Sequence, residues 1–222
     1  MVGQLARLRS VLSIGKLAGT PEAGRYYTDA VAKGREDYYQ GSGEAPGAWA
    51  GTGARLLGLE DRVGDEAFAA LLGGRAPSGG ARLREAQGSH DVAGFDLTFS
   101  APKSVSVLFG LAEERVSGAV REAHDEAVRE ALGYLEREAT FTRRGKGGRR
   151  FERGEGLVAA LFRHRTSRAG DPQLHTHAVV ANTTRADGRW STLDSRAIHR
   201  HAKTAGYLYQ CALREQLTRE LG

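Results

Sequence analysis

Hydrophobic and polar positions follow two different periods along this chain, and the change between them marks the expected elements. In FDLTFS, Phe95, Leu97 and Phe99 alternate with polar residues, which predicts a strand with one buried face. APKSVSVLFGLA continues as a helix with Pro102 in its first turn. From Glu113 to Glu138, apolar residues recur at helical spacing against a charged face, so a long amphipathic helix is expected there.

Other segments complete a mixed pattern. Strands are expected at Leu12–Leu17, Ala139–Arg144, Leu157–Arg165 and Leu174–Asn182, a short helix around Asp65–Leu72 and a final helix over Ser195–Leu221. The glycine-rich stretch before Gly94 is expected to be a lid or loop region wrapped on a scaffold that begins there. This order predicts an α+β fold in which an antiparallel sheet carries helices on one face.

Composition sets the broad class of protein. The chain has 222 residues, enough for one large domain with a well-filled core. Nothing in it resembles a transmembrane span or a signal peptide, so we expect no membrane insertion and a soluble cytoplasmic protein. Its one cysteine, Cys211, excludes an internal disulfide and suits a reducing compartment.

The formal net charge of +5 is modest, but the basic residues are unevenly placed. RRGKGGRRFER holds six of them, Arg143, Arg144, Lys146, Arg149, Arg150 and Arg153. As an exposed hairpin tip this stretch would form a patch suited to phosphates. The alternative is a solvated loop without a partner.

Three histidines form the most specific chemical pattern. His175 and His177 lie two apart in an apolar run, so on a strand both imidazoles point to one face. His164 ends the preceding apolar run, LVAALFRH, and the turn TSRAGDPQ, where Asp171 is expected as a turn former, can fold it back beside them. Three converging imidazoles with open positions are typical of a catalytic metal site, and they suit zinc, nickel or manganese. The alternative is three hydrogen-bonded structural histidines.

Three stretches together, FDLTFSAPKSVSVLFGL, HRTSRAGDPQLHTHAVVAN and RYYTDAVAKGREDYY, resemble the relaxase domain of conjugative plasmid relaxase-helicases of the TrwC/TraI type. The resemblance implies an HUH-endonuclease fold, with a sheet like that of an RNA-recognition motif and the His-x-His strand central. It also implies nicking of one strand at an origin of transfer, a 5′-phosphotyrosine intermediate, and religation by strand transfer during conjugation. We expect residues 1–11 to be an N-terminal extension and residues 12–222 a C-terminally truncated relaxase domain without its helicase region.

The resemblance also assigns roles to particular residues. It implies metal ligands at His164, His175 and His177 and a nucleophile at Tyr26. It also implies an acidic residue, Asp96, that orients a ligand imidazole or accepts the tyrosine proton. Additional tyrosines of the family, one of which can serve a second transfer, are matched by Tyr27, Tyr38 and Tyr39. Lys103 and Arg168 are candidate contacts to DNA phosphates, although Lys103 could equally be a helix-end cation. Magnesium or manganese is the implied metal. The implied partners are single-stranded or hairpin origin DNA, accessory transfer proteins and secretion machinery.

Two other functions remain open at this point. A replication initiator or transposase of the HUH class would share the chemistry, but those relatives usually place the nucleophile after the histidines, whereas Tyr26 precedes them. Outside enzymes, the histidines could stabilise a nucleic-acid-binding module. Loss of metal would unfold such a module but would only silence a catalytic site.

Overall fold

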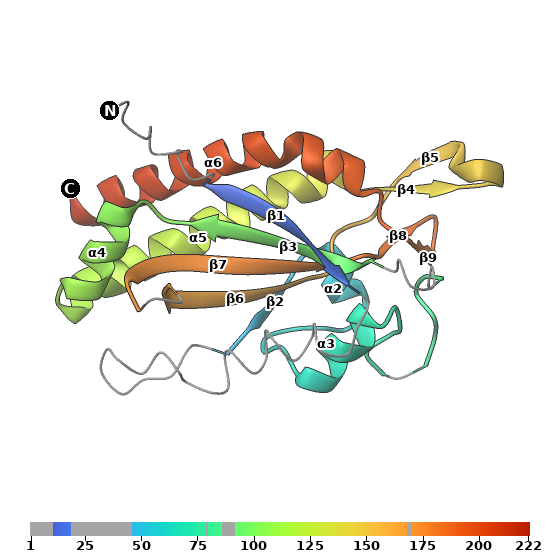
Figure 1. The fold of residues 1–222 in the computed structure, drawn as a ribbon, viewed down its shortest axis with the longest axis horizontal. Helices are drawn as coiled ribbons and strands as arrows, with labels where there is room; N and C mark the ends of the chain where they lie inside the picture. Colours follow the sequence, from blue (N-terminus) through green and yellow to red (C-terminus); the bar gives the residue numbers. More distant parts are fainter. Residues whose placement is uncertain (1–10, 19–45, 79, 86–91, 168–169) are drawn as a thin grey trace, which may run out of the picture.

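The computed structural model describes residues 11–18, 46–78, 80–85, 92–167 and 170–222. Five strands form the main sheet in the order β1-β3-β7-β6-β2, and every neighbouring pair is antiparallel (Figure 1). Their bounds are Leu12–Ala18 (β1), Ala48–Ala50 (β2), Val92–Ser100 (β3), Ala159–Thr166 (β6) and Pro172–Ala181 (β7). The His-x-His strand, β7, is therefore central, as expected.

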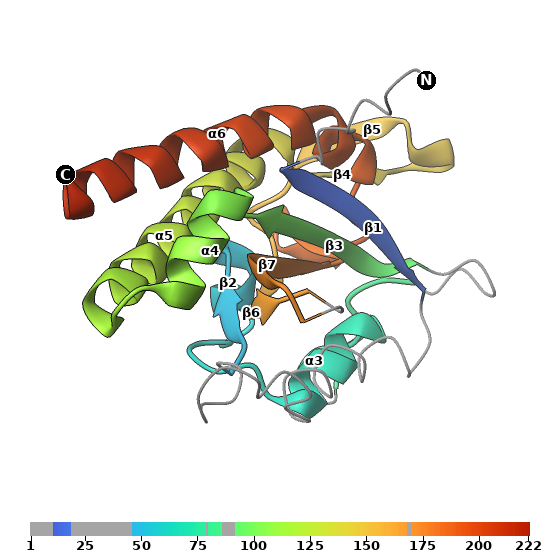
Figure 2. The same ribbon diagram turned by 60° about the vertical axis from the view of Figure 1, so that its left-hand side comes forward.

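The alternating strand pattern buries one face of the sheet under a layer of helices. Three helices form this layer, α4 (Lys103–Leu111), α5 (Glu114–Ala139) and α6 (Ser195–Leu221). Phe95, Leu97 and Phe99 of β3 belong to one apolar core with α5 residues such as Val120 and Leu135. Figure 2 shows α4, α5 and α6 on one side of the sheet and the short helix α3 (Asp65–Leu72) on the other. The predicted α+β class is confirmed.

The glycine-rich stretch before β3 is not a lid, and this prediction was wrong for its described residues. Trp49 lies in β2, which pairs with β6 at the sheet edge, and Phe68 of α3 packs on Phe162 with ring centroids 5.3 Å apart. In this stretch, glycine allows two backbone segments to approach closely. A Cβ at Gly53, in α2 (Thr52–Leu56), would lie 2.8 Å from the Leu157 carbonyl oxygen. The scaffold thus includes residues well before Gly94.

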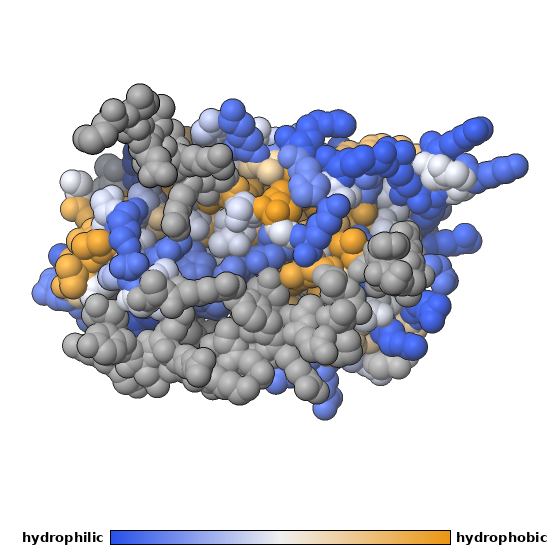
Figure 3. Space-filling view, viewed as in Figure 1, coloured by the Kyte–Doolittle hydropathy of each residue, from blue (hydrophilic) through white to orange (hydrophobic). Residues whose placement is uncertain are grey.

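Two small hairpins extend from the end of the sheet. The first joins β4 (Phe141–Arg144) to β5 (Arg150–Arg153) through a single 3₁₀ turn at Lys146–Gly148, and the second joins β8 (Thr184–Ala186) to β9 (Arg189–Ser191). The basic stretch therefore forms the hairpin tip that its sequence predicted. Hydrophilic side chains project from this end of the molecule in Figure 3.

No helix in the described part of the chain combines the length and apolarity needed to cross a bilayer. The longest, α6, runs for 27 residues, but charged side chains interrupt its apolar positions throughout.

Candidate metal centre

The β6–β7 hairpin brings the three histidines together on the sheet face opposite the α4, α5 and α6 layer. His164 of β6 pairs in register with His175 of β7, and His177 follows two positions along the same strand. Each pair of rings has centroids 5.1 Å apart. One nitrogen from each ring lies within 4.8 Å of the others, so a single cation could contact all three.

Hydrogen bonds fix the tautomers of the two β7 histidines. His177 Nδ1 lies 2.8 Å and 3.0 Å from the two Asp96 carboxylate oxygens, and His175 Nδ1 lies 2.8 Å from the Gln173 carbonyl oxygen. Both partners only accept hydrogen bonds, so each Nδ1 carries the proton. Nε2 is then the nitrogen that would coordinate an ion, an arrangement common among metal-bound histidines.

His164 has the burial and the charge state expected of a metal ligand. The residue is 9% exposed, and its Nε2 is buried with no hydrogen-bond partner among the residues that the structure describes. Burial, reinforced by His175 and His177, lowers the pKa of His164 to about 3, so the ring is neutral near physiological pH. Buried polar atoms are rarely left unpaired, and a neutral imidazole nitrogen is a good metal ligand. The residues present therefore fit a bound divalent cation.

Asp96 lies on β3, the strand next to β7, and faces the histidines rather than the helix layer. Thr98, two residues later on the same face, donates to Asp96 Oδ1 at 3.3 Å and also lies 3.2 Å from His177 Nδ1. The two contacts between the Asp96 carboxylate and His177 Nδ1 are what a residue that orients this imidazole would make.

The turn between β6 and β7 closes the hairpin tightly. The Ser167 amide donates to the Asp171 carbonyl oxygen at 2.9 Å, and the strand register shifts between His164 and Thr166. Asp171 is exposed, and its carbonyl oxygen accepts the hydrogen bond of this turn, as predicted for a turn former.

The candidate DNA-binding residues have different surroundings. Lys103 Nζ donates to the Pro172 carbonyl oxygen at 2.9 Å, which places its charge at the start of β7. Arg144 donates to the carbonyl oxygens of Ala186 and Arg189 and so holds the two small hairpins together.

The other arginines of the basic hairpin are more exposed. Arg143 pairs with Asp194 at 2.7 Å and Arg150 pairs with Glu152 at 2.5 Å, and both keep more than a third of their side chains exposed. Lys146 and Arg149 are exposed at the turn itself. This turn is therefore the part of the hairpin best placed to meet a phosphate backbone.

Several predicted site residues lie outside the described part of the chain: Tyr26, Tyr27, Tyr38, Tyr39 and Arg168. Conversely, the sequence reasoning missed two contacts to the ligands, Thr98 and the Gln173 carbonyl. The two-residue spacing from Asp96 could have indicated Thr98, because both lie on one strand face. A backbone carbonyl carries no such signal.

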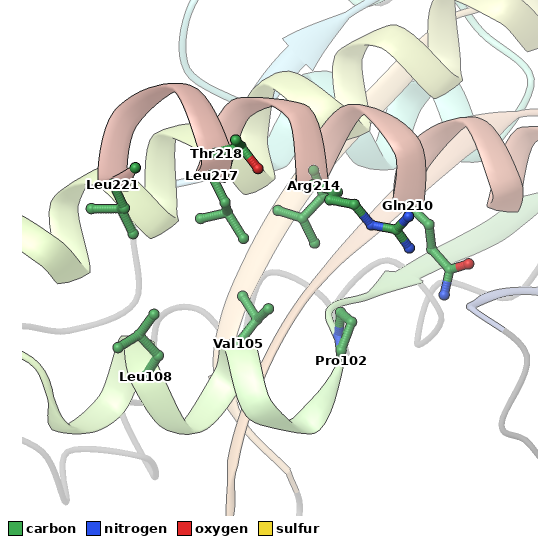
Figure 4. A pocket seen from close by; sticks show the side chains of 10 residues that line it. Pro102, Val105, Leu108, Gln210, Arg214, Leu217, Thr218 and Leu221 are labelled. Atoms are coloured by element: carbon green, nitrogen blue, oxygen red, sulfur yellow. The ribbon is translucent and has the colours of Figure 1, made fainter.

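A separate apolar groove of about 370 Å³ lies between α4 and α6 (Figure 4). Val105 and Leu108 of α4 face Leu217 and Leu221 of α6 across it. It belongs to the helix layer and contains none of the three histidines, so it is distinct from the metal centre.

The chain is similar to proteins of known family. The family model described as TrwC relaxase matches residues 20–222. The multifunctional conjugation protein TraI of Escherichia coli K12 is 38% identical over 218 residues, covering 93% of this chain, and a second Escherichia coli TraI is 38% identical over 216 residues. The chain spans only 12% of the length of either relative.

Solved structures of the conjugative relaxase TrwC also match. A metal-bound complex with oriT DNA is 35% identical with a TM-score of 0.78, and a copper-bound complex is 37% identical with a TM-score of 0.79. A complex with a 27-mer DNA comprising the recognition hairpin and the cleavage site is 34% identical with a TM-score of 0.73. Each match covers 94% of this chain and about 70% of the solved one.

Proposed function

This chain belongs to the TrwC relaxase family, and we propose that it nicks one DNA strand at a plasmid origin of transfer by tyrosine attack and later religates it by strand transfer. The observation that carries the proposal is the histidine triad, which the β6–β7 hairpin gathers on the sheet face away from the main helix layer. Relatives with this fold have been solved with oriT DNA and with metal bound.

His164, His175 and His177 would hold the metal, which we propose is magnesium or manganese, with zinc or nickel as alternatives. A divalent cation there would draw negative charge from the non-bridging oxygens of a bound phosphodiester. The protein contributes three neutral imidazoles, so the ion keeps its full charge. Asp96 contributes by holding His177 in the tautomer that presents Nε2.

Tyr26 is the proposed nucleophile. Its phenol gives up a proton as the phenolic oxygen forms a bond to phosphorus. The bond from phosphorus to the 3′ oxygen breaks, and that oxygen takes up a proton and leaves as a 3′-hydroxyl, so protons balance over the step. The phosphotyrosine retains the energy of the broken bond, because phenolate is a good leaving group and a 3′-hydroxyl can reverse the step. Tyr27, Tyr38 and Tyr39 are the candidates for a second transfer.

The DNA is proposed to be single-stranded at the cut site and to carry a hairpin that contacts a surface of the protein away from the histidines. The exposed turn of the β4–β5 hairpin, with Lys146 and Arg149, suits the phosphates of such a duplex. Because the chain spans a small part of its curated relatives, cytoplasmic action with accessory transfer proteins and secretion machinery belongs to the proposal for the longer protein.

Covalent trapping tests the proposal. Wild type incubated with Mn²⁺ and a panel of origin-derived single strands should give an adduct that survives denaturing electrophoresis. Tyr26→Phe should abolish the adduct and leave DNA binding largely intact, while the matched control Tyr207→Phe, on the exposed face of α6, should keep it. An adduct that persists in Tyr26→Phe would reject the assignment.

An added chelator separates this function from a metal-stabilised binding module. We expect the chelator to stop adduct formation while the circular dichroism spectrum remains that of the folded protein. Unfolding on chelation would instead support structural histidines.

A further inference from the structure

A buried chain of hydrogen bonds lies directly behind the metal-binding strand. Thr176 sits between His175 and His177, and its side chain points the opposite way, toward the helix layer. Its Oγ1 is 2.8 Å from His124 Nε2 on α5, and His124 Nδ1 is 2.8 Å from the Tyr209 hydroxyl on α6. One continuous path therefore connects α6, α5 and the strand that carries two of the three ligands.

These polar groups are sealed inside the core. His124 and Tyr209 are 0% exposed and Thr176 is 3% exposed. Burial lowers the pKa of His124 to about 3, so its ring is neutral, with one nitrogen donating and the other accepting. Both nitrogens are thus satisfied, and the ring is held between two directional bonds. Apolar residues would fill this space at a smaller desolvation penalty, so the polar chain calls for a reason beyond packing.

The pairing of β7 with β6 becomes irregular just beyond the two facing histidines. The β6–β7 register shifts between His164 and Thr166, immediately beside the pair that His164 makes with His175. The ladder is regular on the other side, where Thr176 pairs with Phe99 of β3. Thr176 itself pairs in register with Arg163 of β6 and with Phe99 of β3, so the bond to His124 fixes how far this regular segment of β7 lies from the helix layer, one residue from each of the two histidines.

Movement of Thr176 would displace both neighbouring ligands, because their backbones are continuous with its own. Metal sites tolerate deviations of only about 0.2 Å in ligand distance. A small shift of β7 toward or away from the helices would therefore change how well His175 and His177 converge with His164.

We propose that His124 and Tyr209 are positioning residues for the metal centre. They act through Thr176 to fix the distance between β7 and the helix layer, so that His175 and His177 converge with His164. This inference rests on the proposed metal site. Neither residue touches the ion or the DNA; each acts through β7.

Mn²⁺ binding to the 222-residue chain, measured by isothermal titration calorimetry, tests the inference directly. Tyr209→Phe and Thr176→Val each remove one hydroxyl with little change in shape, and we expect Mn²⁺ affinity to fall about tenfold, the lower end for residues that support metal ligands. Thr176→Ser keeps the hydroxyl and should bind Mn²⁺ nearly as well as wild type.

Tyr134→Phe is the matched control, because Tyr134 on α5 bonds to His201 on α6 at 2.7 Å and so makes the same kind of contact between the same two helices. This pair does not involve β7, so its loss should leave Mn²⁺ affinity unchanged. Circular dichroism establishes that every variant is folded at the temperature of the titration.

The possible results separate the inference from the proposed function. If Tyr209→Phe and Thr176→Val bind Mn²⁺ like wild type while their unfolding temperatures fall, the hydrogen bonds only stabilise the core and the inference is refuted. Equal weakening in Thr176→Ser and Thr176→Val would refute it as well, since the hydroxyl would not be responsible. If wild type itself binds no Mn²⁺, the proposed metal site fails and the inference fails with it.

Discussion

Replacing Asp96 with asparagine tests whether a carboxylate fixes the tautomer of His177. Both Asp96 oxygens lie within 3.0 Å of His177 Nδ1, so the proton is held there and Nε2 presents a lone pair to the ligand cluster. An asparagine amide can instead donate to Nδ1. That contact favours the tautomer with its proton on Nε2, which cannot coordinate a metal.

The expected loss is about 10-fold to 100-fold in Mn²⁺ affinity, which is the usual effect of removing a partner of a metal-bound histidine. This range corresponds to about 1.4 to 2.7 kcal/mol of binding free energy. Titration calorimetry measures it directly. Asp187→Asn is a suitable control, because Asp187 lies in a turn with φ of 48°, a conformation that asparagine tolerates.

The covalent adduct gives a second measurement on the same variant. If Asp96 acts on the metal site alone, adduct yield should fall at low Mn²⁺ and recover when Mn²⁺ is raised to saturation. Unchanged Mn²⁺ affinity in Asp96→Asn would refute the tautomer argument. A yield that stays low at saturating Mn²⁺ would favour the other implied role, in which Asp96 accepts the tyrosine proton.

Two further predictions concern pH and salt. The pKa values of His124 and His164 fall from 6.5 to about 3 on folding, so the unfolded chain binds more protons in that window and stability should decline as pH falls through it. Urea unfolding at neutral and mildly acidic pH checks this, and equal stability at both would contradict it. Replacing Lys146 and Arg149 with alanine should lower the slope of log affinity against log salt for hairpin DNA by about 1 to 2. Arg219→Ala, at the far end of α6 in Figure 1, should not change that slope.

The gathering of the three histidines was readable from the sequence because its geometry is local. Two residues on a strand separated by one position share a face in any fold, so His175 and His177 had to point together. A short turn then returns the chain to His164. The fold class was similarly readable from the helical period of α5 and the alternation in β3.

Other features depended on contacts between distant segments. Asp96 and His177 are 81 positions apart, and they meet because β3 and β7 are neighbours in the sheet. The sequence alone placed Asp96 on the solvent side of its strand. Because β3 lies beside β7 in the sheet, this face of β3 borders the histidine cluster.

The glycine-rich stretch shows the opposite limit of sequence reasoning. Its composition predicted a loop. At Gly51 and Gly53, however, a side chain would not fit, because the Leu157 carbonyl oxygen lies within 2.8 Å of where their Cβ atoms would be. Composition cannot distinguish a glycine used for a turn from one used for close approach. Three-residue strands such as β2 are also too short to show a period.

The sequence by itself determined which side chains could bind a metal and that they would share one face, because strand geometry is set within a few residues. Only the tertiary structure decided what stands around them: Asp96 in front of His177, and His124 with Tyr209 behind Thr176. These partners come from other strands and helices, so their positions follow from packing between layers rather than from the local pattern of the chain.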